Sequence, residues 1–216
     1  MHVIYGGTFD PIHHGHLRLA LEISDALKVA QVHLVPCHIP PHRGSTGASP
    51  EQRLELIRLA IKDEPGLRVD DRELRRAGAS YTADTLLQLR QELGPDEPLV
   101  MVVGTDAFAA FHRWREWADI PDLAHIVVVK RPGADLPVGS EAARLVRERR
   151  ADGAESLRSA PCGMVLELDP PLLDISATGI RQRIADGRSP RYLTPDPVWQ
   201  SIRALGLYGA CPAGNF

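Results

Sequence analysis

Residues 3–16 read VIYGGTFDPIHHGH, and this stretch contains the local pattern that decides the fold. The apolar run at residues 3–5 is a strand candidate, and Gly6 and Gly7 end it. From residue 15 to residue 28 the apolar side chains recur at helical spacing. A short buried strand, a glycine-containing turn and a helix in this order predict the first unit of an α/β fold, with a ligand site at the turn.

The rest of the chain repeats this alternation of strand and helix. Continuous apolar runs at 32–35, 99–103 and 126–129, with weaker runs at 67–69 and 164–168, predict parallel strands buried on both faces. Helices are expected after Pro50, before Gly94, and over residues 140–151, 178–186 and 196–205. The pattern predicts a single α/β domain: a Rossmann-like, doubly wound parallel sheet with helices on both faces.

Composition excludes several classes of protein. The 216 residues carry 25 Lys and Arg against 28 Asp and Glu, a net charge of −3 that argues against a protein coating nucleic acid. No apolar run approaches the roughly 18 residues that a membrane-spanning helix needs. The three cysteines show no CxxC spacing, so neither a disulfide framework nor a zinc ribbon is predicted. We expect a cytoplasmic protein without nucleic-acid or membrane partners.

The histidines of the first turn are the strongest candidates for catalysis. His13 and His16 stand three residues apart at the start of the predicted helix, so both imidazoles share one face. Donors at a helix N-terminus suit a phosphate group that gains negative charge during a reaction. Two alternatives remain: zinc ligation, for which no fourth ligand has a suitable spacing, and surface histidines without a role.

Residues 175–181, ISATGIR, form a second candidate phosphate site. Ser176 or Thr178 can cap the following helix, and Arg181 adds a guanidinium beside the backbone N–H groups. This combination suits the β- and γ-phosphates of a nucleotide. The alternative is an ordinary helix cap with an exposed arginine.

Three further segments are candidates for binding substrates. SYTADTL at residues 80–86 precedes a predicted helix, whose N–H groups suit a small carboxylate. GTD at residues 104–106 ends a predicted strand, where Asp106 suits ribose hydroxyls. Trp114 and Trp117 stand among charged residues, so the Trp114 ring suits stacking on a heteroaromatic ring, whereas packing of a helix on the sheet is favoured for Trp117.

Together these segments resemble a known family. GGTFDPIHHGH resembles the signature of the HxGH nucleotidyltransferase superfamily, and ISATGIR resembles its ISSTxIR motif with Ala177 in place of the second Ser. SYTADTL, GTD, FHRWREW and the terminal RYLTPDPVWQSIRALGLYG resemble bacterial nicotinate-nucleotide adenylyltransferases, and the likeness spans residues 6–209. The resemblance implies a nucleotidyltransferase domain at 1–209, with C-terminal helices from about residue 176, and a tail at 210–216.

The resemblance also implies a reaction and a set of site residues. The adenylyl group of ATP would pass to nicotinate mononucleotide by in-line attack without a covalent intermediate, giving deamido-NAD and pyrophosphate in NAD biosynthesis. Mg²⁺ would arrive with ATP, and no protein metal site is expected. The implied catalytic residues are His13, His16 and Arg181. The implied ATP-binding residues are Gly6, Gly7, Thr8, Phe9, His16, Gly104, Asp106, Arg131, Ser176, Thr178, Ile180 and Arg181. The implied nicotinate mononucleotide-binding residues are His38, Arg43, Tyr81, Thr82, Thr85 and Trp114.

Some features depart from the family pattern or stay open. In many relatives Asn or Ala stands near His38 and Lys replaces Arg43, and Arg holds a phosphate with a different geometry from Lys. The insert at 137–159 is rich in Arg and Glu and predicts a solvated helix without a role. The roles of Asp10 and His14 stay open, as does the oligomeric state, for which a homo-oligomer is compatible. A non-catalytic nucleotide-binding module is the competing interpretation, and pantetheine-phosphate adenylyltransferase shares only the first and last motifs.

Overall fold

The computed structural model describes residues 1–216 apart from 40–45, 77, 131–132, 134 and 212–216. The described strands are β1 (His2–Gly7), β2 (Val32–Pro36), β3 (Leu67–Val69), β4 (Leu99–Gly104), β5 (His125–Val129) and β6 (Val165–Leu168). They form one sheet in the order β3-β2-β1-β4-β5-β6, and every neighbouring pair is parallel. This is the strand order of a doubly wound fold, so the predicted fold class is confirmed.

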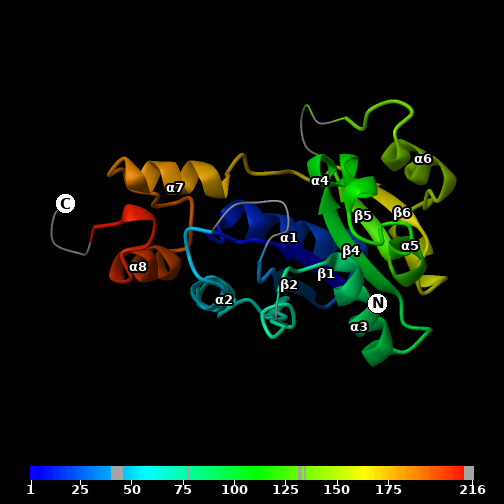
Figure 1. Ribbon diagram of the computed structural model, residues 1–216, viewed down its shortest axis with the longest axis horizontal. Coiled ribbons are helices and arrows are strands. Elements are labelled where there is room, and N and C mark those ends of the chain that lie inside the picture. Colours follow the sequence, from blue (N-terminus) through cyan, green and yellow to red (C-terminus); the bar gives the residue numbers. More distant parts are fainter. Residues whose placement is uncertain (40–45, 77, 131–132, 134, 212–216) are drawn as a thin grey trace.

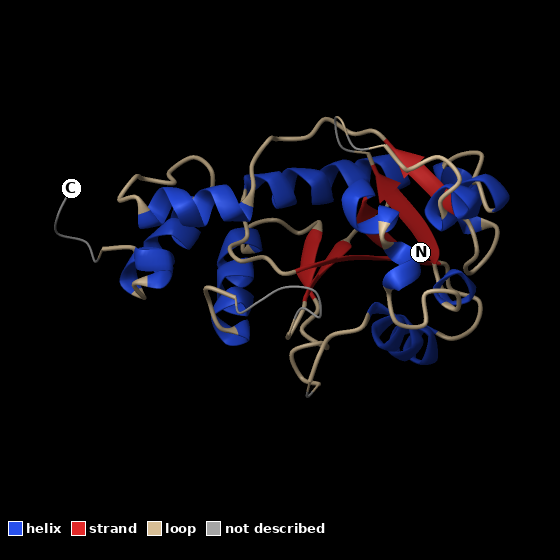
Figure 2. Cartoon of the chain, turned by 45° about the horizontal axis from the view of Figure 1, so that its top comes forward, coloured by secondary structure: helices blue, strands red, loops and turns tan. Residues whose placement is uncertain are grey.

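The described α-helices are α1 (His14–Leu27), α2 (Pro50–Ile61), α3 (Thr82–Leu93), α4 (Thr105–Ala109), α5 (Ile120–Leu123), α6 (Glu141–Glu148), α7 (Ala177–Ala185) and α8 (Asp196–Ala204). Short 3-10 helices are η1 (Phe111–Arg113), η2 (Ala154–Arg158) and η3 (Leu207–Gly209). Helices lie on both sides of the strands (Figure 2). Within the described residues, no helix has the length and apolar character to cross a membrane.

Two apolar clusters hold the helices on opposite faces of the sheet. Val3 and Tyr5 belong to the cluster that includes α1 and α2, whereas Ile4 belongs to the cluster that includes α3 and α6. Successive side chains of a strand point to opposite faces, so continuous apolar runs supply both clusters. The runs recognised in the sequence are therefore the strands of the observed sheet.

The insert differs from its prediction. The predicted helix at 140–151 is shorter, Glu141–Glu148, and it is not fully solvated, because Ala142 and Leu145 are buried in the second apolar cluster. The prediction of a solvated helix is therefore wrong for one of its faces. The helix carries mostly charged side chains on its outer face, so its short apolar face was not recognised from the sequence.

The C-terminal elements lie beyond one end of the sheet. Figure 1 shows α7 and α8 together on the side away from β5 and β6. Helix α8 packs against α2, and η3 packs against both α7 and α8. The long connection from β6 to α7 carries the ISATGIR segment back to the start of α1, where Ile175 lies close to Gly15.

Candidate active site

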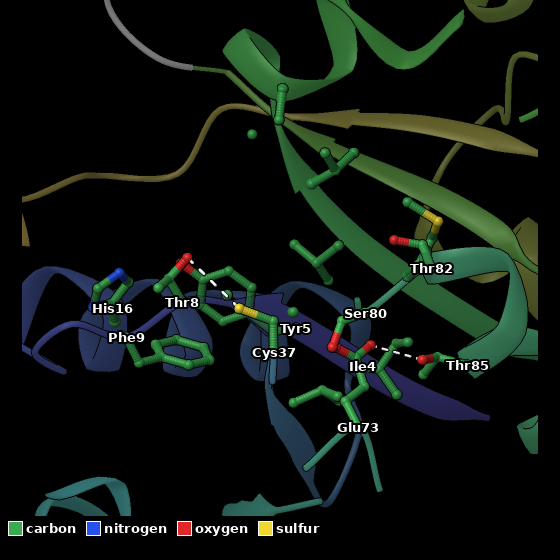
Figure 3. Close-up of a pocket in the computed structure, with 18 of the residues that line it drawn as sticks. Ile4, Tyr5, Thr8, Phe9, His16, Cys37, Glu73, Ser80, Thr82 and Thr85 are labelled. Carbon is green, nitrogen blue, oxygen red and sulfur yellow. Dashed lines mark hydrogen bonds between the residues drawn. The ribbon is translucent and has the colours of Figure 1, made fainter. Parts of the chain in front are cut away.

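A pocket of about 720 Å³ opens at the carboxyl ends of β1 and β4. β1 and β4 are neighbours at the topological switch point, where the strand order of the sheet reverses. Ligands bind at this point in open α/β folds. The lining residues that the sequence had implicated are Gly6, Gly7, Thr8, Phe9, His16, Tyr81, Thr82, Thr85, Gly104, Asp106, Trp114 and Arg181. Figure 3 shows Thr8 and His16 at one end of this pocket, with Thr82 and Thr85 at the other. The pocket therefore has two ends, each served by a different motif.

The two histidines of the first turn meet at the start of α1. His13 is the N-cap of the helix, and its Nδ1 accepts from the backbone N–H of His16 at 3.4 Å. The two rings stack with centroids 3.7 Å apart and an angle of 23° between their planes. His13 is buried, whereas His16 lines the pocket. An Nδ1 that accepts leaves the proton on Nε2, so the cap orients the His13 ring as a donor at that atom.

Gly6 and Gly15, two of the three glycines of this region, have different surroundings. A Cβ atom on Gly15 would lie 3.0 Å from Nδ1 of His13 and 3.3 Å from the carbonyl oxygen of Ile175. Gly15 therefore leaves room for the protein's own groups at the start of α1. A Cβ atom on Gly6 would meet no protein atom within 4 Å, so the open space lies at the end of β1.

Arg181 reaches the same end of the pocket from α7. Ser176 caps this helix by accepting from the N–H of Gly179 at 3.1 Å. The Arg181 guanidinium donates to the carbonyl oxygen of Asp10 at 2.6 Å and to Oγ1 of Thr178 at 3.3 Å. Its side chain is 32% exposed and is held by these two acceptors. Ser176, Thr178 and Ile180 are not among the lining residues, and the Ile180 side chain is buried in the core.

A fully buried arginine, which sequence reasoning missed, supports the first loop. Arg53 on α2 donates to the carbonyl oxygen of Thr8 at 2.7 Å and to that of His38 at 2.9 Å. His38 lies outside the pocket lining, where its Nδ1 is 3.0 Å from the carbonyl oxygen of Arg76 and its N–H donates to Ser80 Oγ at 2.8 Å. Hydrogen bonds of Arg53 and His38 therefore link the loop at Thr8, at one end of the pocket, to the segment at Ser80, near the other end.

The other end of the pocket is formed by the start of α3. Tyr81 is its N-cap, and within the described residues its side chain makes no cap hydrogen bond. Thr85 Oγ1 donates to Oε1 of Glu73 at 2.7 Å, and burial raises the pKa of this glutamate. The Arg115 guanidinium lies 4.9 Å from the centre of the Tyr81 ring. Glu73 and Arg115 both line the pocket, although neither was among the implicated residues: Glu73 lies outside the quoted motifs, and Arg115 lies within FHRWREW.

The tryptophans lie in a turn after η1 rather than on one helix. Trp114 lies 5.4 Å from Phe111 between ring centroids, and Trp117 lies 6.1 Å from Phe111 with an edge-on geometry. Both are half-buried against the second apolar cluster. Only Trp114 lines the pocket. The expected division holds: Trp117 packs, whereas one side of Trp114 faces the cavity.

Two implicated residues, Arg43 and Arg131, lie outside the described residues. Cys37, Met101 and Ala107 line the described pocket but carry no pattern that singles them out. Among the described residues, no three His, Cys, Asp or Glu side chains form a group that could hold a metal ion.

The fold and this pocket define a class of nucleotidyl-transferring protein, and comparisons with known proteins agree. A family model described as cytidylyltransferase-like matches residues 4–183. The chain is 76% identical to a Marinobacter nauticus protein named "Probable nicotinate-nucleotide adenylyltransferase", over 98% of each chain. A Cellvibrio japonicus protein of the same name is 50% identical, over 95% of this chain and 97% of that one. The chain belongs to the nicotinate-nucleotide adenylyltransferase family.

Solved structures support the same fold. A Plasmodium falciparum nicotinic acid mononucleotide adenylyltransferase complexed with NaAD superposes with a TM-score of 0.72 at 18% identity, over 97% of both chains. The same Plasmodium protein complexed with APC superposes with a TM-score of 0.70 and the same identity and coverage. At this identity the likeness concerns the arrangement of the chain.

Proposed function

We propose that this pocket transfers the adenylyl group of ATP to nicotinate mononucleotide, producing deamido-NAD and pyrophosphate in NAD biosynthesis. The observation that carries the proposal is one cavity lined both by His16 with Arg181 and by the start of α3 with Trp114. His16 and Thr82 lie at opposite ends of it (Figure 3). One end suits a triphosphate and the other suits a pyridine ring with a carboxylate. The names of the close relatives agree with this reaction.

The triphosphate would lie against the first turn and the start of α7. The loop that follows β1 would contact the triphosphate through Gly6, Gly7, Thr8 and Phe9. The ribose would face Gly104 and Asp106. The His13 and His16 imidazoles would donate to the α-phosphate and its bridging oxygen as charge develops there. Arg181 would hold the β- and γ-phosphates, with Ser176 and Thr178 preparing the helix end. Mg²⁺ would be bound mainly by the phosphates of ATP.

The transfer needs no covalent enzyme intermediate. A phosphate oxygen of nicotinate mononucleotide attacks the α-phosphorus of ATP and forms the new P–O bond. The bond from that phosphorus to the bridging oxygen breaks on the opposite side, and pyrophosphate leaves with the electron pair. Because the enzyme forms no bond, its contribution is to position both substrates and to stabilise the charge on the leaving group.

The acceptor end would prefer an acid to an amide. Backbone N–H groups at Tyr81 and Thr82 would face the carboxylate, and the Arg115 guanidinium adds a cation beside them. The Trp114 face would stack on the pyridine ring. A carboxamide would turn its NH₂ group toward at least one of these donors and leave it unpaired, which disfavours nicotinamide mononucleotide.

The test is product formation by purified protein with ATP and Mg²⁺, followed by chromatography of the dinucleotide and by pyrophosphate release. Three acceptors are compared: nicotinate mononucleotide, nicotinamide mononucleotide and phosphopantetheine. The proposal expects equal amounts of deamido-NAD and pyrophosphate with the acid, and much slower turnover with the amide. Binding of ATP without pyrophosphate release for any acceptor would instead favour a non-catalytic binding module.

A further inference from the structure

A tyrosine near the C-terminus packs against the end of the pocket proposed to bind the triphosphate. Tyr208 belongs to η3, beyond the residues that the family model matches. Its ring lies so close to the loop before α2 that a Cβ atom on Gly47 would be 2.6 Å from its Cδ1. Tyr208 adopts φ 59° and ψ 20°, a left-handed conformation that is unfavourable for a residue with a Cβ atom. Several tertiary contacts therefore hold this side chain in place.

The Tyr208 hydroxyl contacts the carboxylate of Asp10, whose role the sequence left open. The hydroxyl donates to Oδ1 of Asp10 at 2.8 Å, and the N–H of Ala48 donates to the same oxygen at 3.1 Å. The N–H of Gly47 donates to Oδ2 at 2.9 Å. Asp10 is only 5% exposed, so these donors replace the water that its charge would otherwise attract.

The same carboxylate is the acidic neighbour of Arg181. Nη1 of Arg181 lies 3.7 Å from Oδ2 of Asp10, which is beyond a hydrogen bond, while it donates to the Asp10 carbonyl oxygen at 2.6 Å. The guanidinium is thus anchored by a neutral carbonyl and stands apart from the carboxylate. In this arrangement the positive charge of Arg181 is only partly compensated, which favours binding of a phosphate.

We infer that Tyr208 is a positioning residue for Arg181: by donating to Asp10, its hydroxyl keeps that carboxylate from closing onto the guanidinium. Without the hydroxyl, Oδ1 keeps a single donor, and the carboxylate gains by turning toward Arg181. A closed ion pair would draw the guanidinium away from the β- and γ-phosphates. This inference rests on the proposed function, because it concerns the phosphates that Arg181 is proposed to hold.

The test compares Tyr208→Phe with Tyr192→Phe. The first change removes the hydroxyl and keeps the ring against Gly47, while Tyr192 is 80% exposed and its ring lies beside the Arg191 guanidinium. We expect the KM for ATP, and the KM for pyrophosphate in the reverse reaction, to rise about tenfold in Tyr208→Phe, in keeping with loss of a hydrogen bond to a charged group. The KM values for nicotinate mononucleotide and deamido-NAD should not change. Tyr192→Phe should match the unmodified protein in all four.

A double-mutant cycle separates positioning from a general loss of structure. If Tyr208 acts through Arg181, the change Tyr208→Phe should have little further effect on the KM for ATP in an Arg181→Gln background. Equal rises in all four KM values, no rise in any, or full additivity with Arg181→Gln would overturn the inference. Titration of the protein with pyrophosphate alone gives a readout that needs no acceptor: weaker binding to Tyr208→Phe is expected, and unchanged binding contradicts the inference. If the unmodified protein forms no deamido-NAD, the proposed function fails, and this titration still decides the role of Tyr208.

Discussion

The substitution Gly6→Ala should separate stability from activity at the end of β1. A Cβ atom at this position meets no protein atom within 4 Å, and Gly6 is not among the residues with positive φ, so alanine causes neither clash nor strain. Alanine in a strand is favoured over glycine by about 0.5–1 kcal/mol. In a chain of this size that gain raises Tm by roughly 1–4 °C. The structure therefore predicts a variant that is slightly more stable.

The same methyl group would lie in the space that the nucleotide needs. Overpacking a close contact costs about 1–3 kcal/mol, which corresponds to a loss of about 5- to 150-fold in kcat/KM. Thermal denaturation and steady-state kinetics with varied ATP measure the two effects. Gly153→Ala is the matched control, because its Cβ also meets open space but lies outside the pocket. A Gly6→Ala enzyme with raised Tm and unchanged kcat/KM would refute the placement of the nucleotide.

Three further predictions test other parts of the account. His16→Ala should lower kcat by ~10²–10³ with the fold intact, as for loss of one donor to a developing charge; near-normal turnover in a folded variant would contradict the proposed role. Arg115→Gln should reduce the preference for the acid, measured as the ratio of kcat/KM for nicotinate mononucleotide to kcat/KM for nicotinamide mononucleotide. Arg113→Gln should preserve this ratio, because Arg113 lies outside the pocket lining. Equal ratios in the two variants would show that Arg115 does not recognise the acid. Burial, together with the neighbouring His33, lowers the pKa of His2 to about 4, so the unfolded chain binds more protons than the folded one between about pH 4 and its ordinary value of 6.5. This contribution to stability is present above pH 6.5 and is lost as the pH falls through that window; a His2→Gln variant should show a shallower fall in Tm over this range, and an unchanged slope would argue against the buried neutral form.

The sheet was predictable because its strands carry an unambiguous signal. The runs at 99–103 and 126–129 are apolar at every position, and each lies within an observed strand, β4 and β5. Short helices such as α4 and α5 were not predicted, since five or four residues are too few to establish a helical period. The turn after η1 misled in another way, because Trp114 and Trp117 have helical spacing without forming a helix.

The candidate site was predictable where local motifs mark it. His16 and Arg181 come from segments far apart in the chain, yet each segment is marked by its own residues as a candidate phosphate-binding helix start, and both residues line one pocket. The residues that support His16 and Arg181 could not be predicted from the sequence. Arg53 acts through Thr8 and His38, and Tyr208 acts on Asp10 across most of the chain. Such contacts depend on tertiary packing and leave no periodic trace in the sequence.

The central claim is that both substrates meet in one pocket in a defined orientation. The most direct measurement is a crystal structure of this protein with deamido-NAD bound. We expect the adenylate phosphate beside His16 and Arg181, and the nicotinate carboxylate at the start of α3 beside Trp114. A product bound in the reverse orientation, or outside the pocket at the carboxyl ends of β1 and β4, would contradict the proposed placement of the two substrates.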